Sequence, residues 1–189
     1  MEKNIREVIG NYKYHFLGAI QMKAIVFTSN TGTTEKYARL LADKTGLPAY
    51  SSEQARRELA DGSEIIYLGW LKAGGIAGYA KAAKRYSVKA VCGVGMGKTG
   101  SQLDDVRKRN SIPAEMPVFT LQGGFDMNKL RGVYKFMMKT MQRVVGKSLT
   151  EKPDRTPEED DMLDMMLHGG ERVSEENLRA VLEWYENIR

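Results

Sequence analysis

The chain has 189 residues, of which 42% are hydrophobic and 28% are charged, and its net charge is +5. This length is enough for one domain with a substantial core. The single cysteine, Cys92, excludes a disulfide framework and is typical of a reducing compartment. No apolar run approaches the length of a membrane span, and the first twenty residues lack the compact apolar stretch of a signal peptide. We therefore expect a cytoplasmic protein.

The charge is unevenly distributed along the chain. Residues 1–149 carry 24 basic and 12 acidic side chains, whereas residues 150–189 carry 5 basic and 12 acidic ones. A basic surface attracts acidic partners, anionic lipid or nucleic acid. A basic face that is merely solvated would have the same composition, so both interpretations stay open.

The first segment, residues 1–21, has apolar side chains at helical spacing, interrupted by Gly10 and Gly18. It is either an added helix or an N-terminal extension with little fixed structure. From Met22 the pattern alternates. Strands are predicted at 22–28, 47–51, 64–70, 88–94 and 117–121, and helices at 33–44, 53–59, 76–86 and 101–109. Continuous apolar strands that alternate with helices indicate a parallel sheet covered on both faces.

Three further helices are predicted after the fifth strand, at 130–145, 158–167 and 174–188. Ser174 is the expected N-cap of the last one, since its hydroxyl can accept a hydrogen bond from the first turn. Residues 122–172 are therefore predicted to be a helical insertion within a domain that spans residues 22–189.

A turn rich in hydroxyl groups joins the first strand to the first helix. It consists of Ser29, Asn30, Thr31, Gly32, Thr33 and Thr34. The free amides of a first helical turn and the helix dipole favour an anion at such a place. Hydroxyl donors without a cation suit a phosphate monoester that stays bound, rather than a phosphoryl group that is transferred. The alternative is a polar turn that only caps the helix.

This turn resembles the Ser/Thr-x-Thr-Gly-x-Thr phosphate loop of flavodoxins, which also follows the first strand of the sheet. The resemblance implies an α/β fold of three layers, with a doubly wound, five-stranded parallel sheet in the order 2-1-3-4-5. It also implies FMN as the cofactor, with its 5′-phosphate in this loop, beyond the carboxyl ends of the strands. Flavodoxin electron carriers are typically acidic, and this basic chain departs from them.

The resemblance carries over to the loop after the third strand, which in flavodoxins lies against the isoalloxazine ring. Here that loop is Trp70, Leu71, Lys72, Ala73, Gly74 and Gly75. By resemblance, Trp70 would stack on the ring, and the two glycines would let the backbone approach the flavin N5 edge. The alternative is a tryptophan that completes a core strand.

The loop after the fourth strand is, by resemblance, the second one that faces the flavin. It consists of Gly93, Val94, Gly95, Met96 and Gly97. Flavodoxins often carry a tyrosine here, which covers the second face of the ring. This loop has no tyrosine, so that face stays open unless Met96 covers it. Residues 95–100 also match the dinucleotide fingerprint G-x-G-x-x-G, but they follow the fourth strand and no acid lies twenty residues on. The sequence Gly97-Lys98-Thr99 resembles a P-loop, but Cys92 stands where that motif needs glycine.

A glycine pair, Gly123 and Gly124, follows the fifth strand and precedes the long helix rich in methionine and lysine. These features resemble the flavodoxin branch that contains menaquinone-dependent protoporphyrinogen dehydrogenase. The resemblance implies a redox donor and acceptor, one of them an apolar molecule such as a quinone or a porphyrinogen.

Residues 129–147 contain no acid, and basic side chains recur every four residues beside an apolar stripe. Such a helix either contacts an anionic membrane surface peripherally or packs its stripe on the domain.

The histidines, His15 and His168, do not cluster with other ligands, so we expect no metal. No catalytic residue can be assigned. The main hypothesis is an FMN redox protein; the alternatives are a flavin-free binding or regulatory module and a nucleotide- or nucleic-acid-binding domain. Aromatic residues are not interleaved with basic ones, so we expect no nucleic acid as a partner.

Overall fold

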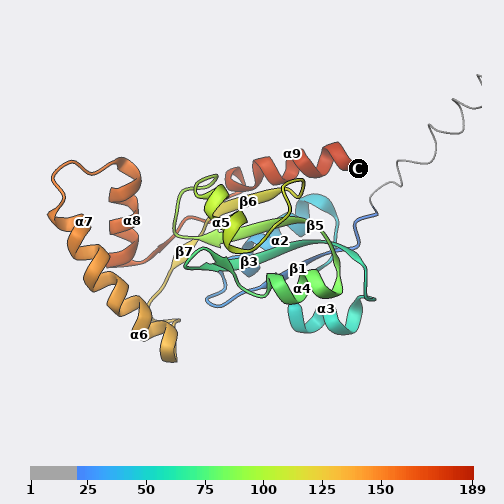
Figure 1. Ribbon diagram of the computed structural model, residues 1–189, viewed down its shortest axis with the longest axis horizontal. Helices are drawn as coiled ribbons and strands as arrows, with labels where there is room; N and C mark the ends of the chain where they lie inside the picture. The colour runs from blue at the N-terminus through green and yellow to red at the C-terminus, as the bar shows by residue number, and fades with distance from the viewer. Residues whose placement is uncertain (1–20) are drawn as a thin grey trace, which may run out of the picture.

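A computed structural model describes residues 21–189, so nearly all of the predicted N-terminal segment, 1–21, lies outside the described residues. Five parallel strands form the centre of the fold in the order β2-β1-β3-β5-β6 (Figure 1). Their bounds are β1 (Ala24–Thr28), β2 (Ala49–Ser51), β3 (Glu64–Lys72), β5 (Ser87–Gly95) and β6 (Val118–Gln122). This is the flavodoxin-like topology, and the predicted fold class is confirmed.

Helices cover both faces of the sheet. On one face lie α2 (Thr33–Thr45) and α9 (Arg179–Ile188), which contribute Leu41 and Val181 to a buried cluster. On the other lie α3 (Ser52–Glu58), α4 (Tyr79–Arg85) and α5 (Leu103–Arg109), which contribute Ala55, Tyr79 and Val106 to a second cluster. Successive strand residues alternate between the two clusters because neighbouring side chains point to opposite faces.

Cys92 lies at the centre of the sheet, where β5 pairs with both β3 and β6. The thiol is fully buried, and burial raises its pKa to about 12. Since the thiolate is the reactive form, we expect native protein to resist a thiol reagent at pH 8 and to react fully once unfolded. Timed alkylation read by intact mass, with and without denaturant, tests this. Rapid modification of the native form would contradict it.

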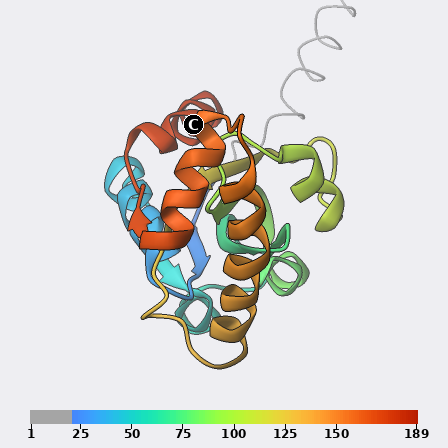
Figure 2. The ribbon, with the colours of Figure 1, turned by 90° about the vertical axis from the view of Figure 1, so that its left-hand side faces the viewer.

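The chain leaves the main sheet after β6 and returns before α9. The departure and the return form a short antiparallel ribbon of β7 (Gly124–Phe125) and β8 (Gly170–Glu171). We call residues 126–169, between these strands, the excursion. It lies beyond the carboxyl edge of the sheet (Figure 1), and its helices stand in front of the sheet when the molecule is viewed from that end (Figure 2). The sequence predicts the two helices but not the ribbon.

The first helical part of the excursion is longer than the predicted helix at 130–145. It consists of α6 (Gly132–Met141), a π-helical turn η1 (Gln142–Gly146) and α7 (Lys147–Glu151). The second part is α8 (Pro157–His168). Its start is well specified, because the Thr156 hydroxyl accepts a hydrogen bond from the Glu159 amide at 3.3 Å and the Glu159 carboxylate accepts one from the Thr156 amide at 3.0 Å.

Two further predicted boundaries differ from the structure by more than two residues. The helix expected at 76–86 begins only at Tyr79, because β4 (Gly75–Ile76) first pairs antiparallel with β3. The closing helix opens with a 3-10 turn, η2 (Glu176–Leu178), before α9. The hydroxyl of Ser174 does accept a hydrogen bond from the Asn177 amide at 3.3 Å, as an N-cap would.

Candidate functional site

The turn between β1 and α2 lies at the carboxyl edge of the sheet. Gly32 immediately precedes α2 and has φ 95°, a conformation that side chains rarely adopt. Its amide donates a hydrogen bond to the Ser29 hydroxyl at 3.1 Å, which tightens the turn. The strand therefore leads directly into a helix N-terminus that faces this edge.

The first turn of α2 holds donors that the described residues leave unused. The amides of Thr33, Thr34 and Glu35 have no acceptor within hydrogen-bonding distance among residues 21–189, as expected for the first turn of a helix. The Thr34 side chain lies in the same turn and is 1% exposed. This cluster of free donors is what an anion would complete.

The glycine pair after β6 lies against this turn. The Gly123 amide donates to the carbonyl of Gly95 at 2.7 Å. A Cβ on Gly123 would lie 2.8 Å from both Thr33 Cγ2 and Val94 Cγ1, so only glycine fits there. Three predicted segments therefore converge: the hydroxyl-rich turn, the end of β5 and the Gly123–Gly124 pair.

The segment predicted as a loop after the third strand forms a tight β-hairpin in the structure. Strand β3 continues to Lys72 and folds back through Ala73 and Gly74 into β4. Asn110 holds this hairpin, since its amide group donates to the Gly74 carbonyl at 2.9 Å and its side-chain oxygen accepts from the Ile76 amide at 2.7 Å.

The hairpin therefore packs toward the end of α5, and Gly74 and Gly75 do not line the cavity beside the hydroxyl-rich turn. Leu71 lies over Gly93 and Gly95, where an added Cβ would meet its side chain.

Trp70 and Met96 both contact the excursion. The Trp70 ring meets the Tyr134 ring edge-on, with 5.3 Å between centroids, and the Lys72 ammonium lies 4.9 Å from the same Tyr134 ring. Met96 packs on a cluster formed by Phe125, Leu130 and Met165, with Met127, Tyr134 and Met138 around it. The two residues assigned to the flavin ring by resemblance thus lie beneath an apolar cover supplied by the excursion.

The glycine-rich loop after β5 is engaged in structural contacts. The Thr99 hydroxyl accepts from the Gln122 amide at 2.9 Å and lies 2.7 Å from the Asn177 side-chain oxygen. Lys98 pairs with Glu158 of α8 at 2.9 Å. Helix α5 begins only at Leu103, after Gln102 at φ 60°. Because the strand does not run directly into a helix here, this loop lacks the turn that a dinucleotide pyrophosphate needs.

A cavity of about 530 Å³ lies between the hydroxyl-rich turn and the excursion. Thr31, Thr33 and Lys36 line one side. The other walls come from residues 124–129, from Gln142 and from the segment 166–171. The Lys36 ammonium is 2.6 Å from the Glu171 carboxylate, so this cation beside the turn is paired within the protein.

A polar network that the sequence did not reveal anchors the excursion. The Arg172 guanidinium donates to the carboxylates of Asp161 at 3.0 Å and Asp164 at 3.2 Å. The Gln122 side chain also donates to Asp161, at 2.6 Å. On the other side, the Asn177 amide group donates to the Tyr37 hydroxyl at 2.7 Å and to the Arg172 carbonyl at 2.8 Å. Burial raises the pKa of Tyr37, which therefore stays protonated.

Replacing Arg172 with glutamine should loosen the excursion while leaving the sheet intact. The substitution removes the donors that join α8 to the chain after β8, and charged hydrogen bonds are the stronger ones. We expect amide exchange in α8 to accelerate on the order of tenfold in hydrogen-exchange mass spectrometry. The matched control is Arg179→Gln, since among residues 21–189 Arg179 pairs only with exposed Glu176. Equal exchange in both variants would contradict the anchoring role.

Comparisons with protein-family models, curated proteins and solved structures found no match. Within residues 21–189, no group of three histidine, cysteine or acidic side chains is placed to hold a metal ion. No helix in this part of the chain combines the length and hydropathy needed to cross a bilayer. The fold and the site therefore define a flavodoxin-like α/β domain with a hydroxyl-rich turn at its carboxyl edge.

Proposed function

We propose that this protein binds FMN at the carboxyl edge of its sheet and transfers electrons through it. The observation that carries the proposal is the first turn of α2, where the amides of Thr33, Thr34 and Glu35 have no acceptor among the described residues. Thr31 and Thr33 of the same turn line the adjoining cavity. A phosphate monoester supplies the acceptors that these donors lack.

The charge around the turn favours a phosphate that stays bound. Lys36 is paired with Glu171, so hydroxyl and amide groups, rather than an ammonium group, would hold the phosphate. A cavity of about 530 Å³ adjoins Thr31 and Thr33 and provides room for the rest of the ligand. Bound FMN supplies one- and two-electron transfer, while the protein positions it and controls its surroundings.

The excursion is the part of the chain that would select a redox partner. Met127, Met138 and Tyr134 form a flexible apolar surface beside Trp70 and Met96. Methionine side chains adapt to irregular apolar molecules. This surface supports an apolar donor or acceptor of the quinone or porphyrinogen kind, in line with the resemblance to the branch that contains menaquinone-dependent protoporphyrinogen dehydrogenase.

Cofactor identification tests this function directly. Purified protein is denatured, and the released small molecules are separated and identified by mass; the apoprotein is then titrated with FMN, riboflavin and FAD. We expect FMN to be released and to rebind more tightly than riboflavin. If the apoprotein does not bind FMN supplied in excess, the proposal is ruled out.

One observation favours a second function. Tyr134 already contacts the Trp70 ring edge-on, so an aromatic side chain occupies part of the surface that a flavin ring would use. A flavin-free binding or regulatory module would keep this contact permanently. The titration separates the two functions, because FMN that displaces Tyr134 should change Trp70 fluorescence. A Trp70→Phe variant assigns the signal to Trp70 rather than to Trp184.

A further inference from the structure

The outer face of the excursion exposes apolar side chains to an unusual degree. Helix α6 contributes no buried residue, although it is rich in apolar ones. Val133 is 71% exposed, Phe136 is 73% exposed and Val144 in η1 is 64% exposed. Apolar side chains that gather on one exposed surface mark an interaction site more often than chance.

These three side chains lie along one face of a continuous helix. Their separations of three and eight residues correspond to about 0.8 and 2.2 helical turns, so the three side chains fall within about 80° of the helix circumference. At a rise of about 1.5 Å per residue, they span roughly 16 Å. A straight line of apolar side chains fits a flat surface better than a pocket.

A row of cations runs beside this line. Lys135, Lys139 and Arg143 follow one another at intervals of four residues, and Lys139 and Arg143 are exposed. None of the three forms an ion pair with any of residues 21–189, and no acidic residue occurs in the segment 129–147. Several other cations of the excursion are paired, as Lys152 is with Glu159 at 2.7 Å. The unpaired row is therefore positioned for an external anion.

We propose that this face, formed by Val133, Phe136, Val144, Lys135, Lys139 and Arg143, docks on the surface of an anionic lipid bilayer. The apolar line enters the interface while the cations contact lipid phosphates, as in amphipathic helices that lie in the plane of a membrane. The charge complementarity and the straight line of apolar groups together favour a bilayer over an acidic protein. The proposal does not rest on flavin binding.

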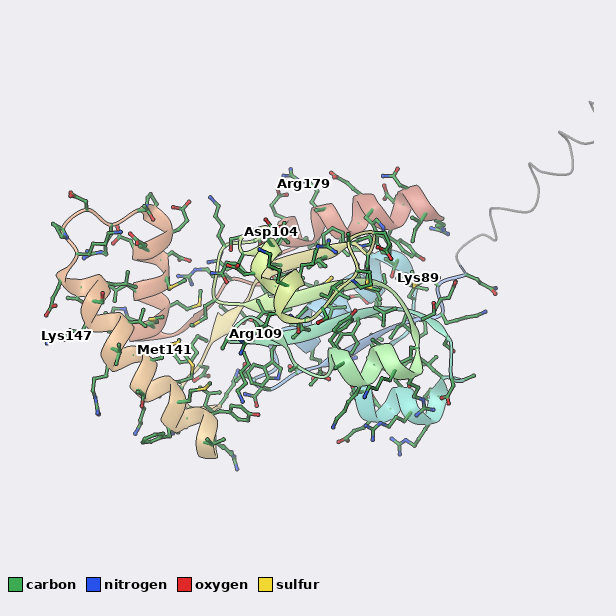
Figure 3. All side chains as sticks on the ribbon, in the orientation of Figure 1. Lys89, Asp104, Arg109, Met141, Lys147 and Arg179 are labelled. Atoms are coloured by element: carbon green, nitrogen blue, oxygen red, sulfur yellow. The ribbon has the colours of Figure 1, made fainter. Side chains whose placement is uncertain are left out.

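The position of the helix gives the docking a consequence for the cavity. The excursion projects beyond the carboxyl edge of the sheet, with Lys147 toward its far end (Figure 3). Gln142 and Leu167 of the excursion also line the cavity, and Leu167 is 56% exposed. Docking through this face therefore holds the cavity close to the bilayer, within reach of a lipid-soluble molecule.

Vesicle flotation of the full-length protein tests the proposal. One set of vesicles is pure phosphatidylcholine, and the other contains about one third phosphatidylglycerol, which supplies negative surface charge. We expect binding to the anionic vesicles only, and release as sodium chloride is raised. Failure to bind anionic vesicles at low salt, or equal binding to both sets, would overturn the proposal.

Two variants locate the contact. Neutralising Lys135, Lys139 and Arg143 to glutamine should weaken vesicle binding roughly 100-fold, because each cation near such a surface contributes about a fivefold factor. Val133→Ser with Phe136→Ser should weaken it at least about tenfold by removing the apolar insertion. Both sets of side chains are largely exposed, so circular dichroism should show an unchanged fold.

A charge-matched control comes from the opposite part of the molecule. Arg57→Gln, Lys81→Gln and Lys84→Gln change three exposed cations on α3 and α4, away from the excursion (Figure 1). This triple variant should bind anionic vesicles within about twofold of the unaltered protein, because its cations lie on helices away from the docking face and are not part of it. A loss as large as that of the excursion triple would show nonspecific attraction of a basic protein and refute the proposed face.

Discussion

Replacing Thr31 and Thr34 together with valine should weaken FMN binding roughly 100-fold and change riboflavin binding by less than about threefold. Thr31 lines the cavity, and Thr34 lies in the first turn of α2, whose amides have no acceptor among the described residues. Valine keeps the shape of threonine but removes the hydroxyl donor. Hydrogen bonds to a charged phosphate contribute about 1.5–3 kcal/mol each, so losing two removes about 3 kcal/mol or more.

The two ligands make this comparison specific. Riboflavin shares the ring and the ribityl chain of FMN but lacks the phosphate, so any general damage to the site weakens both. A Thr31→Ser, Thr34→Ser variant serves as the control, because it keeps both hydroxyl groups and should retain FMN within about fivefold. Titration calorimetry gives all the affinities. Parallel losses for FMN and riboflavin would show that the phosphate is not held by this turn.

Replacing Gly78 with alanine should destabilise the folded domain by about 3–5 kcal/mol. Gly78 has φ 81°, and an added Cβ would overlap the Tyr67 hydroxyl and lie 2.6 Å from the Thr28 hydroxyl. Those two hydroxyls form a hydrogen bond at 2.8 Å, and Thr28 is also 2.8 Å from the Ser52 hydroxyl. The extra methyl group would break this network between β1, β3 and α3, in addition to straining the backbone.

Gly62 supplies the matched control for this substitution. It has φ 79°, close to that of Gly78, but a Cβ there would meet nothing within 4 Å. Gly62→Ala therefore measures backbone strain alone, which costs about 1 kcal/mol. The difference between the two variants in chemical denaturation isolates the clash. Similar midpoints for both would mean that the Tyr67–Thr28 network adjusts without cost.

The sheet could be predicted because its central strands correspond to continuous apolar runs in the sequence. The segments 64–70 and 88–94 are buried on both faces, and helices with clear apolar spacing separate them, so the period of the sequence specifies the layers. The hydroxyl-rich turn was equally visible, since its residue types are local to one strand end. In each case a short stretch of sequence contains all the information.

Contacts between distant segments could not be predicted in this way. The pairing of Gly124 with Glu171 joins residues almost fifty positions apart, and two-residue strands leave no periodic signal. The sequence likewise does not distinguish Arg172 from an ordinary surface cation, because Asp161 and Asp164 lie close to it only in the folded structure. The edge-on contact of Tyr134 with Trp70 depends on where the excursion docks, which hydrophobic periodicity does not encode.

The ribbon of β7 and β8 gives the molecule a modular architecture. Phe125 and Gly170 are direct partners in that ribbon, so the chain leaves and re-enters the α/β body at neighbouring points. In topological terms, everything between them is one oversized hairpin loop. Such a loop can lengthen, shorten or change its surface chemistry without disturbing the strand order. The residues that contact a partner can therefore vary within the excursion while the α/β body stays constant.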